Sequence, residues 1–303
     1  MSSVELSTEK AGWRDYLELC KPAVVVVMIV TSMIGMFLAV PGMVPVDILV
    51  LGNFGIALCA ASAATVNHLV DRQVDMKMAR TLNRPIATGR VEPVQAAIFA
   101  ALLGTMGMAI LLVYINALTA WLTLASLLGY AVVYTIFLKR ATPQNIVIGG
   151  LAGAVPPLLG WTAVTNDVHP HALLLVLIVF IWTPPHFWAL ALHRKEEYAK
   201  ADVPMLPVTH GARYTKLHIL LYTIVLIPVT VLPWLVGMCG WMYLLGALVL
   251  GGGFLYWAIE LMISDKPDLG MATFKYSIIY LLALFTIMLI DHYLVASPGW
   301  VGA

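Results

Sequence analysis

Long apolar stretches alternate with short polar connections along almost the whole chain. Nine of these stretches reach the roughly 17–25 residues that a helix needs to cross a bilayer. We predict membrane-spanning helices at 23–40, 48–66, 94–113, 117–138, 144–163, 172–192, 217–237, 240–262 and 274–295. The predicted fold class is therefore an all-α membrane protein, with nine transmembrane helices in one bundle around a central cavity that opens toward the cytoplasm.

This pattern also divides the chain. Residues 1–22 are expected to form a cytoplasmic N-terminal segment, and 23–295 a single nine-helix domain. Residues 296–303 would form a short outer tail. Two long polar connections, 67–93 and 193–216, interrupt the apolar pattern. They are the expected active-site loops.

Basic residues predict how the bundle is oriented. All 17 Lys and Arg residues fall on the N-terminal segment, on connections that nine spans place on the same side as it, or, for Lys275, in the first turn of the ninth span beside such a connection. Cytoplasmic loops carry an excess of Lys and Arg, so we expect the N-terminus inside and the C-terminus outside. The N-terminal residues resemble neither a signal peptide nor an organelle transit sequence, which favours a bacterial inner membrane.

Composition supports a membrane protein and excludes other classes. Apolar residues make up 61% of the chain and charged residues 11%, against about a quarter charged in soluble domains. The lipid bilayer is therefore an expected partner. A net charge of +1 argues for no nucleic-acid partner. The three cysteines have no metal-binding spacing, so packing as small apolar side chains is the preferred interpretation.

The first long connection carries the clearest chemical signal. Asn67, Asp71 and Asp75 recur at intervals of four, so a helix that continued through Asp75 would align them along one face. Their oxygens suit Mg²⁺, which keeps positions for water and substrate phosphate, and the basic residues that follow suit phosphate oxygens. The pattern predicts a metal–diphosphate site at the cytoplasmic end of the bundle. A solvated loop of paired charges is the alternative.

The second long connection offers a further group of acids, Glu196, Glu197 and Asp202. Their spacing is less diagnostic, and taken alone they are better explained as part of an ordinary charged loop. On the same membrane face as the first group, they could hold a second metal or share one diphosphate.

The end of the sixth predicted span, W-T-P-P-H-F-W, places Pro184 and Pro185 inside an apolar helix. These prolines are expected to break or kink the helix. The backbone carbonyls that lose their hydrogen bonds are expected to line a cavity. His186 and His193 lie seven residues apart, nearly on one helix face. An ionisable group at membrane depth is a functional candidate, and a packing histidine is the equally weighted alternative.

These motifs together resemble a known family. The N-x-x-x-D-x-x-x-D segment with the A-R-T-x-N-R-P that follows is similar to the first aspartate motif of intramembrane prenyltransferases of the UbiA type. Within that family, R-T-x-x-R-P, P-P-H-F-W-A-L and E-Y-x-x-A-D-V-P-M-L-P-V resemble members that farnesylate protohaem IX. The resemblance covers about residues 15–290, including the nine-helix count.

The resemblance implies Mg²⁺ as cofactor, farnesyl diphosphate and protohaem IX as substrates, and haem O as product. It also implies a downstream haem A synthase or oxidase-assembly factor as partner. The implied catalytic residues are Asn67, Asp71, Asp75, Glu197 and Asp202, and the implied metal ligands are Asn67, Asp71, Asp75, Glu196 and Glu197. The implied diphosphate ligands are Arg72, Lys77, Arg80, Arg84, Lys139, Arg140 and Arg194. The implied haem contacts are Trp182, His186, His193 and Tyr198. A second D-x-x-x-D, frequent in the wider family, is absent because position 201 is alanine.

Three other functions fit parts of the pattern. A related prenyltransferase with a quinone precursor as acceptor would share the metal–diphosphate site and differ on the acceptor side. An intramembrane alcohol phosphotransferase would need a D-G-x-x-A-R segment, which is absent. A transporter or haem exporter would place its ionisable groups near the bilayer midplane, whereas these acids gather at one surface.

Overall fold

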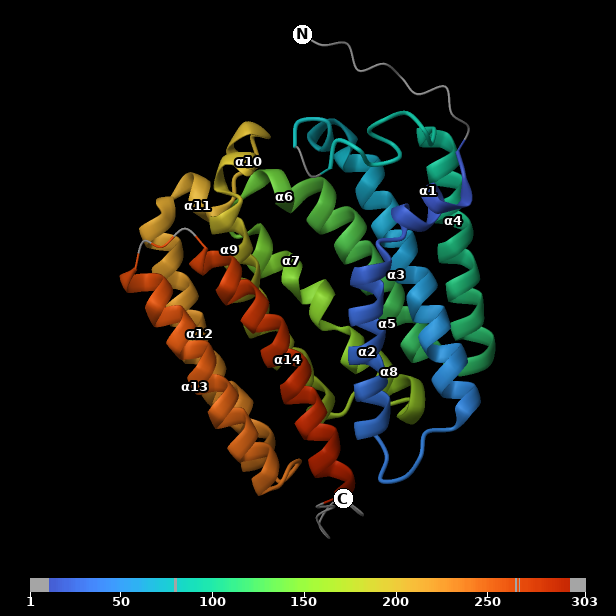
Figure 1. Cartoon of the computed structure of the whole chain (residues 1–303). Helices are drawn as coiled ribbons and strands as arrows, with labels where there is room; N and C mark the ends of the chain where they lie inside the picture. The colour runs from blue at the N-terminus through green and yellow to red at the C-terminus, as the bar shows by residue number, and fades with distance from the viewer. Residues whose placement is uncertain (1–10, 79–80, 265, 267, 295–303) are drawn as a thin grey trace.

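The chain folds into a bundle of long helices (Figure 1). This computed structural model describes residues 11–78, 81–264, 266 and 268–294, and no strand occurs within them. The helices are α1 (Trp13–Leu19), α2 (Pro22–Leu38), α3 (Val46–Asp75), α4 (Pro93–Ile110), η1 (Leu111–Ile115), α5 (Ala117–Leu128), η2 (Gly129–Leu138), α6 (Lys139–Ala141), α7 (Asn145–Ala154), α8 (Pro156–Thr165), α9 (Pro170–His193), α10 (Lys195–Lys200), α11 (Leu206–Thr209), α12 (Gly211–Leu235), α13 (Trp241–Ile263) and α14 (Leu269–Leu294).

The predicted spans match the observed helices. Among the described residues, eight continuous helices are long and apolar enough to cross a membrane, and the bent pair α1–α2 raises the number to nine if it forms one span. The pair bends by 53° at Lys21, whose φ of 49° lies in the left-handed region. Pro22 is the first residue of α2. The backbone N–H at this position has no partner within a helix, so the absence of an N–H in proline costs no hydrogen bond.

Two local features differ from a simple run of α-helices. Of the break or kink predicted at Pro184 and Pro185, the break is wrong, since α9 continues as one helix from Pro170 to His193. Both prolines are buried, and α7, α12 and α14 pack along this helix, so neighbouring helices hold it across the missing hydrogen bonds. The other feature is η2, a ten-residue π-helix that continues α5. Such segments are rare and often occur at functional sites.

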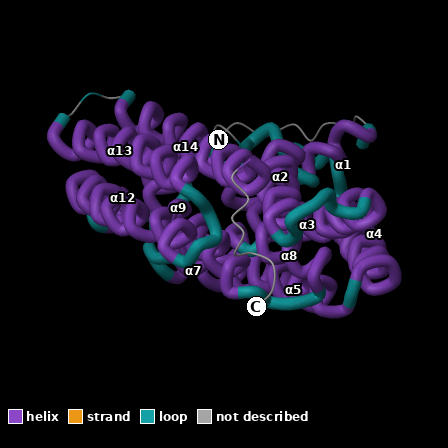
Figure 2. The backbone as a smooth tube through the Cα atoms, turned by 90° about the horizontal axis from the view of Figure 1, so that it is seen from below, coloured by secondary structure: helices purple, strands orange, loops and turns teal. Residues whose placement is uncertain are grey.

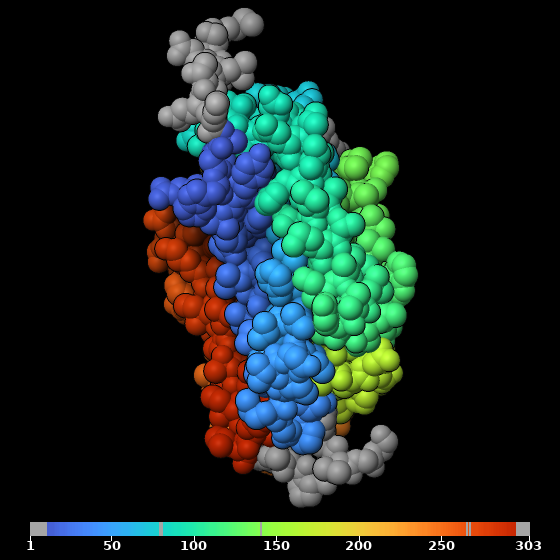
Figure 3. All heavy atoms as spheres, turned by 90° about the vertical axis from the view of Figure 1, so that its right-hand side faces the viewer, coloured from blue at the N-terminus to red at the C-terminus, as the bar shows by residue number. Residues whose placement is uncertain are grey.

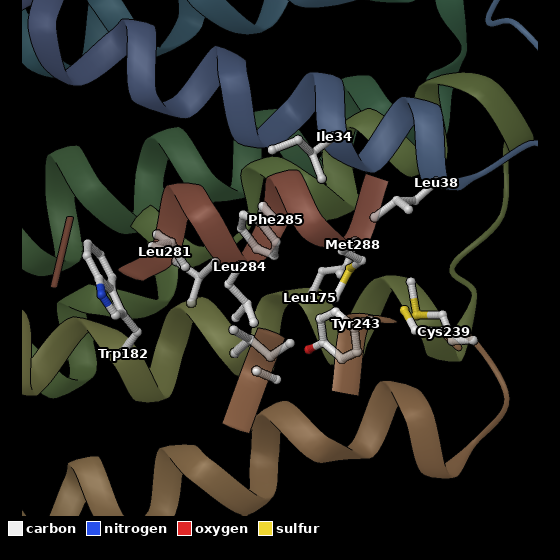
Figure 4. Packing of buried hydrophobic residues seen from close by; sticks show 14 of the residues in the cluster. Ile34, Leu38, Leu175, Trp182, Cys239, Tyr243, Leu281, Leu284, Phe285 and Met288 are labelled. Carbon is white, nitrogen blue, oxygen red and sulfur yellow. The ribbon is translucent and has the colours of Figure 1, made fainter. Parts of the chain in front are cut away.

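Small residues allow the closest helix contacts. A Cβ on Gly160 of α8 would lie 1.9 Å from the carbonyl oxygen of Ser32 on α2, and one on Gly35 would lie 2.0 Å from that of Pro157. In a lipid environment the hydrophobic effect does not drive helices together, so close packing of this kind stabilises their association instead. Larger side chains from α9, α13 and α14 fill the neighbouring core, where Leu175, Tyr243 and Phe285 are fully buried (Figure 4).

The bundle has an elongated cross-section, with α12 and α13 at one end and α4 at the other (Figure 2). The outward side of α4 is apolar. Ile98, Leu102 and Met106 are each more than half exposed. Figure 3 presents the side of the bundle on which α4 lies. This surface suits contact with lipid.

Polar connections gather at one end of the bundle. Figure 1 places α1, the connection between α3 and α4, α6, α10 and α11 at the same end, and the C-terminal end of α14 at the opposite one. The two long connections predicted as active-site loops therefore meet at a single face of the protein.

Candidate active site

The polar ridge predicted on the first connection is part of a helix. Because α3 extends to Asp75, Asn67, Asp71 and Asp75 follow one face at its end, and all three are buried. The Asn67 Nδ2 donates to Asp71 Oδ2 at 2.9 Å and to Thr135 Oγ1 of η2 at 3.3 Å. The ridge is therefore anchored against the π-helix.

Three basic side chains converge on this ridge from three different segments. Lys21 donates to the Asn67 Oδ1, and Lys139 of α6 pairs with Asp71. The Arg84 Nη1 contacts both carboxylate oxygens of Asp75 at 2.8 Å. Three positive charges thus face two carboxylates, and this positive excess favours a polyanion such as diphosphate.

The crowding of like charges is visible at Lys21. Burial, together with the nearby Arg84 and Lys139, lowers the pKa of this amine to about 7, while Asp71 and Asp75 act in the opposite direction. An anion that entered this cluster would relieve the repulsion among the three cations.

The donor set of the ridge fits Mg²⁺. It offers two carboxylates and one amide oxygen, and the buried Asp71 Oδ1 has no hydrogen-bond partner. Hard divalent cations prefer such oxygen ligands and leave further positions to water and phosphate. Within the described residues no group of three or more His, Cys, Asp or Glu side chains is placed to hold a metal.

A large apolar cavity adjoins the polar cluster. It measures about 570 Å³ and lies among α2, α3, α5, η2, α7, α9 and α14. Lys21 is part of its wall and also contacts Asn67, so the cavity begins where the charged cluster ends. Small residues of α3 and α7 and apolar residues of α2 and α14 form most of the lining.

The π-helix η2 shapes one wall of this cavity. Tyr130 and Tyr134 stack on each other with ring centroids 5.4 Å apart, and both line the cavity. Gly149 makes this possible, because a Cβ there would lie 2.0 Å from the Tyr134 ring. The Thr135 Oγ1, which also receives the bond from Asn67, donates to the carbonyl of Tyr130.

The residues expected on the acceptor side separate into two groups. Trp182 and His186 line the cavity. His193 is exposed at the end of α9, and Tyr198 packs in a different apolar cluster beneath α10. The structure thus brings two of the four expected haem contacts to the cavity wall.

The described contacts of the ridge residues Asn67, Asp71 and Asp75 do not include the acids of the second connection. Glu196 is exposed, and Glu197 lies 3.8 Å from Arg194. Asp202 is exposed and pairs at 3.2 Å with Lys77 of the first connection, which links the two connections directly.

The remaining basic candidates are placed as follows. Arg72 is exposed near the end of α3. Arg80 lies outside the described residues, as does the side chain of Arg140. Lys21 and Thr135 were not expected at the site from the sequence. The signal that could have indicated Lys21 is a lone cation directly before Pro22 at the start of the first span.

Comparison of this chain with known proteins identifies a matching family and similar relatives. The UbiA prenyltransferase family matches residues 28–290. A relative from Saccharophagus degradans, called protoheme IX farnesyltransferase, is 71% identical over 287 residues, which cover 95% of each chain.

Two solved structures share the fold. A digeranylgeranylglyceryl phosphate synthase structure superposes with a TM-score of 0.78 at 18% identity, covering 92% of this chain and 98% of the other. A UbiA homologue from Archaeoglobus fulgidus, bound to DMAPP and Mg²⁺, gives 0.67 at 18% identity, covering 90% and 99%. This chain, a multi-pass membrane protein, therefore belongs to the UbiA prenyltransferase family.

Proposed function

We propose that this enzyme transfers the farnesyl group of farnesyl diphosphate to a vinyl group of protohaem IX, with addition of water. The products are haem O and diphosphate, and haem O serves haem–copper oxidases. The observation that carries the proposal is the buried ridge of Asn67, Asp71 and Asp75, with three cations around it, directly beside an apolar cavity. The relative at 71% identity is named for this reaction.

The polar cluster is the proposed diphosphate site. Asn67, Asp71 and Asp75 would hold Mg²⁺, the ion present in the related Archaeoglobus structure. When bound, the ion stabilises the negative charge of the departing diphosphate. Lys21, Lys139 and Arg84, which now contact the ridge, are placed to exchange these contacts for phosphate oxygens. Guanidinium and ammonium groups make charge-assisted hydrogen bonds of this type.

The apolar cavity is the proposed site of carbon–carbon bond formation. The bond between C1 of the farnesyl group and the diphosphate oxygen breaks, and its electron pair leaves with diphosphate. The π electrons of the vinyl group then form the new bond to C1. Water adds to the resulting cation and loses a proton, which gives the hydroxyl of haem O. Few polar groups line the cavity, so the first cation is protected from premature capture by water.

Glu196, Glu197 and Asp202 are proposed to complete the site on the second connection. All three are at the same end of the bundle as the ridge, and the Lys77–Asp202 pair already joins the two connections. A downstream haem A synthase or oxidase-assembly factor is the proposed recipient of haem O.

The choice of acceptor is tested with purified protein in lipid nanodiscs. Farnesyl diphosphate and Mg²⁺ are supplied with either protohaem IX or an aromatic acid of the kind used in quinone synthesis, and products are identified by mass spectrometry. We expect farnesylated, hydrated haem and no prenylated aromatic acid. Prenylation of the aromatic acid alone would assign the enzyme to the quinone branch of the family.

We further propose that the polar end faces the cytoplasm of a bacterial cell, with 23–295 as the single catalytic domain. The support is the basic character of the connections at that end. Asn83→Cys and Asp167→Cys place a thiol on connections at opposite ends. In intact spheroplasts a membrane-impermeant maleimide is expected to label Asp167→Cys alone. Labelling of Asn83→Cys alone would reverse the orientation.

A further inference from the structure

We propose that His186 is the axial ligand that binds the iron of protohaem IX through its Nε2. This inference rests on the proposed function, because it assigns a residue to the binding of the haem substrate. It concerns the wall of the cavity opposite α3, where α9 and α14 face each other across Trp182, His186, Phe274 and Ser277.

The position of His186 suits a haem that reacts beside the diphosphate site. His186 lies seven residues before the end of α9, or about 10 Å along the helix axis. Asn67 lies eight residues before the end of α3, or about 12 Å. Both helices end at the polar face (Figure 1), and both border the cavity. Each residue therefore lies about two helical turns before the end of its helix, and the two helices border the same cavity.

The ring of His186 is held so that only one edge is available. It stacks on Trp182 with centroids 4.1 Å apart and on Phe274 with centroids 4.6 Å apart, so neighbours cover both of its faces. The Nδ1 edge contacts the Ser277 Oγ at 2.6 Å. The Nε2 edge remains, and His186 borders the cavity.

The hydrogen bonds around Ser277 favour one tautomer. The Ser277 Oγ lies 2.6 Å from the Phe274 carbonyl oxygen and 2.6 Å from the His186 Nδ1, and its single proton can serve only one of these contacts. With that proton on the Phe274 carbonyl, the Nδ1 of His186 carries its own proton and Nε2 has a free lone pair. No described residue hydrogen-bonds to this Nε2.

This arrangement is the one that metal-binding histidines use. Such residues donate the proton of one ring nitrogen to an oxygen and bind the metal through the other, and the hydrogen bond fixes both tautomer and ring orientation. A second bond stiffens the support, since the Trp182 Nε1 donates to the Ser277 carbonyl at 2.8 Å. A histidine that only packed between helices would need neither a fixed tautomer nor an unpartnered nitrogen at a cavity wall.

Other histidines of the chain lack this combination. Both ring nitrogens of His68 are buried without a hydrogen-bond partner, but His68 does not border the cavity. His193 is exposed beyond the cavity. The structure therefore singles out His186 for a ligand that enters the cavity.

The test is spectroscopic and needs no turnover. Ferric protohaem IX is titrated into the purified full-length protein in nanodiscs, and the Soret band and resonance Raman spectrum are recorded. We expect a histidine-ligated spectrum for the wild type. His186→Ala should lose this spectrum and bind haem at least about 10-fold more weakly, by analogy with the effect of weakened metal sites. Added imidazole should restore the ligated spectrum, which shows that the variant is folded.

Two further variants separate ligation from general damage. Ser277→Ala keeps the nitrogen ligand but removes its orienting partner, so the iron–histidine stretching frequency should shift while ligation persists. His210→Ala, which alters an exposed histidine in the second connection, should leave the spectrum unchanged. A His186→Ala spectrum identical to that of the wild type overturns the assignment.

Haem O formation by the same wild-type preparation is measured in parallel. If the wild type makes haem O while His186→Ala keeps the wild-type spectrum, axial ligation by His186 is wrong and the proposed reaction stands. If the wild type neither binds haem nor makes haem O, both proposals fail.

Discussion

Replacing Asp71 with asparagine is expected to lower the rate of haem O formation by about 10²–10³-fold, the range seen when one stabilising group of a preorganised site is removed. Asparagine keeps the size and one oxygen but loses the negative charge that would hold Mg²⁺. Asp71 is central to the ridge, since it contacts both Asn67 and Lys139. The measurement is the initial rate of haem O production at saturating farnesyl diphosphate, followed by mass spectrometry over a range of Mg²⁺ concentrations.

Asp47→Asn is the matched control for this variant. Asp47 is on the same helix, α3, but lies exposed in its first turn at the opposite end of the bundle. This variant should keep wild-type activity. Full activity of Asp71→Asn at every Mg²⁺ concentration would remove Asp71 from the proposed metal site.

Replacing Lys139 with methionine is expected to destabilise the metal-free protein by about 3–5 kcal/mol, the usual result of leaving a buried charge unpaired. The Asp71 side chain is only 1% exposed, and Lys139 is its cationic partner. Mg²⁺ alone should stabilise this variant more than the wild type, because the ion supplies the positive charge that Asp71 has lost. Thermal unfolding in detergent, with and without Mg²⁺, measures both effects.

Lys77→Met gives the comparison. Lys77 pairs with Asp202 at 3.2 Å, but the two side chains are 54% and 82% exposed. Exposed pairs of this kind contribute at most about 1 kcal/mol, so little change in stability is expected. The interpretation of Lys139 is contradicted if both variants lose the same stability, or if Mg²⁺ stabilises Lys139→Met no more than the wild type.

The helical architecture could be predicted from the sequence because its cause is local. Each apolar stretch must satisfy its backbone hydrogen bonds within itself in a lipid environment, so the stretches alone indicate the helices. The spacing of Asn67, Asp71 and Asp75 is a property of the same kind. It required only that α3 continue to Asp75, as it does.

Features that depend on contacts between distant segments could not be predicted. Lys21 contacts Asn67 across 46 residues, and Thr135 contacts it across 68. No periodicity in the sequence reports such pairs. The break expected at Pro184 and Pro185 failed for the same reason, because packing by neighbouring helices outweighs the local preference of proline.

The interpretation of His186 on the acceptor side needed both the sequence and the folded structure. His186 stood out in the sequence as an ionisable residue in an apolar span, with packing as an equal alternative. The tautomer inferred for it depends on Ser277 and Phe274, which lie on α14 about ninety residues further along the chain. Only the folded structure distinguishes a histidine with a free Nε2 at a cavity wall from one that merely fills space.

The polar ridge and the adjoining cavity are proposed to farnesylate protohaem IX together. The most direct test is to incubate the purified wild type with protohaem IX, farnesyl diphosphate and Mg²⁺, and to quantify haem O and released diphosphate in the same samples. Equal amounts of the two products, abolished by chelation of Mg²⁺ and restored by its return, are the predicted result. Release of diphosphate without haem O, or haem O formation that is insensitive to chelation, would contradict the account.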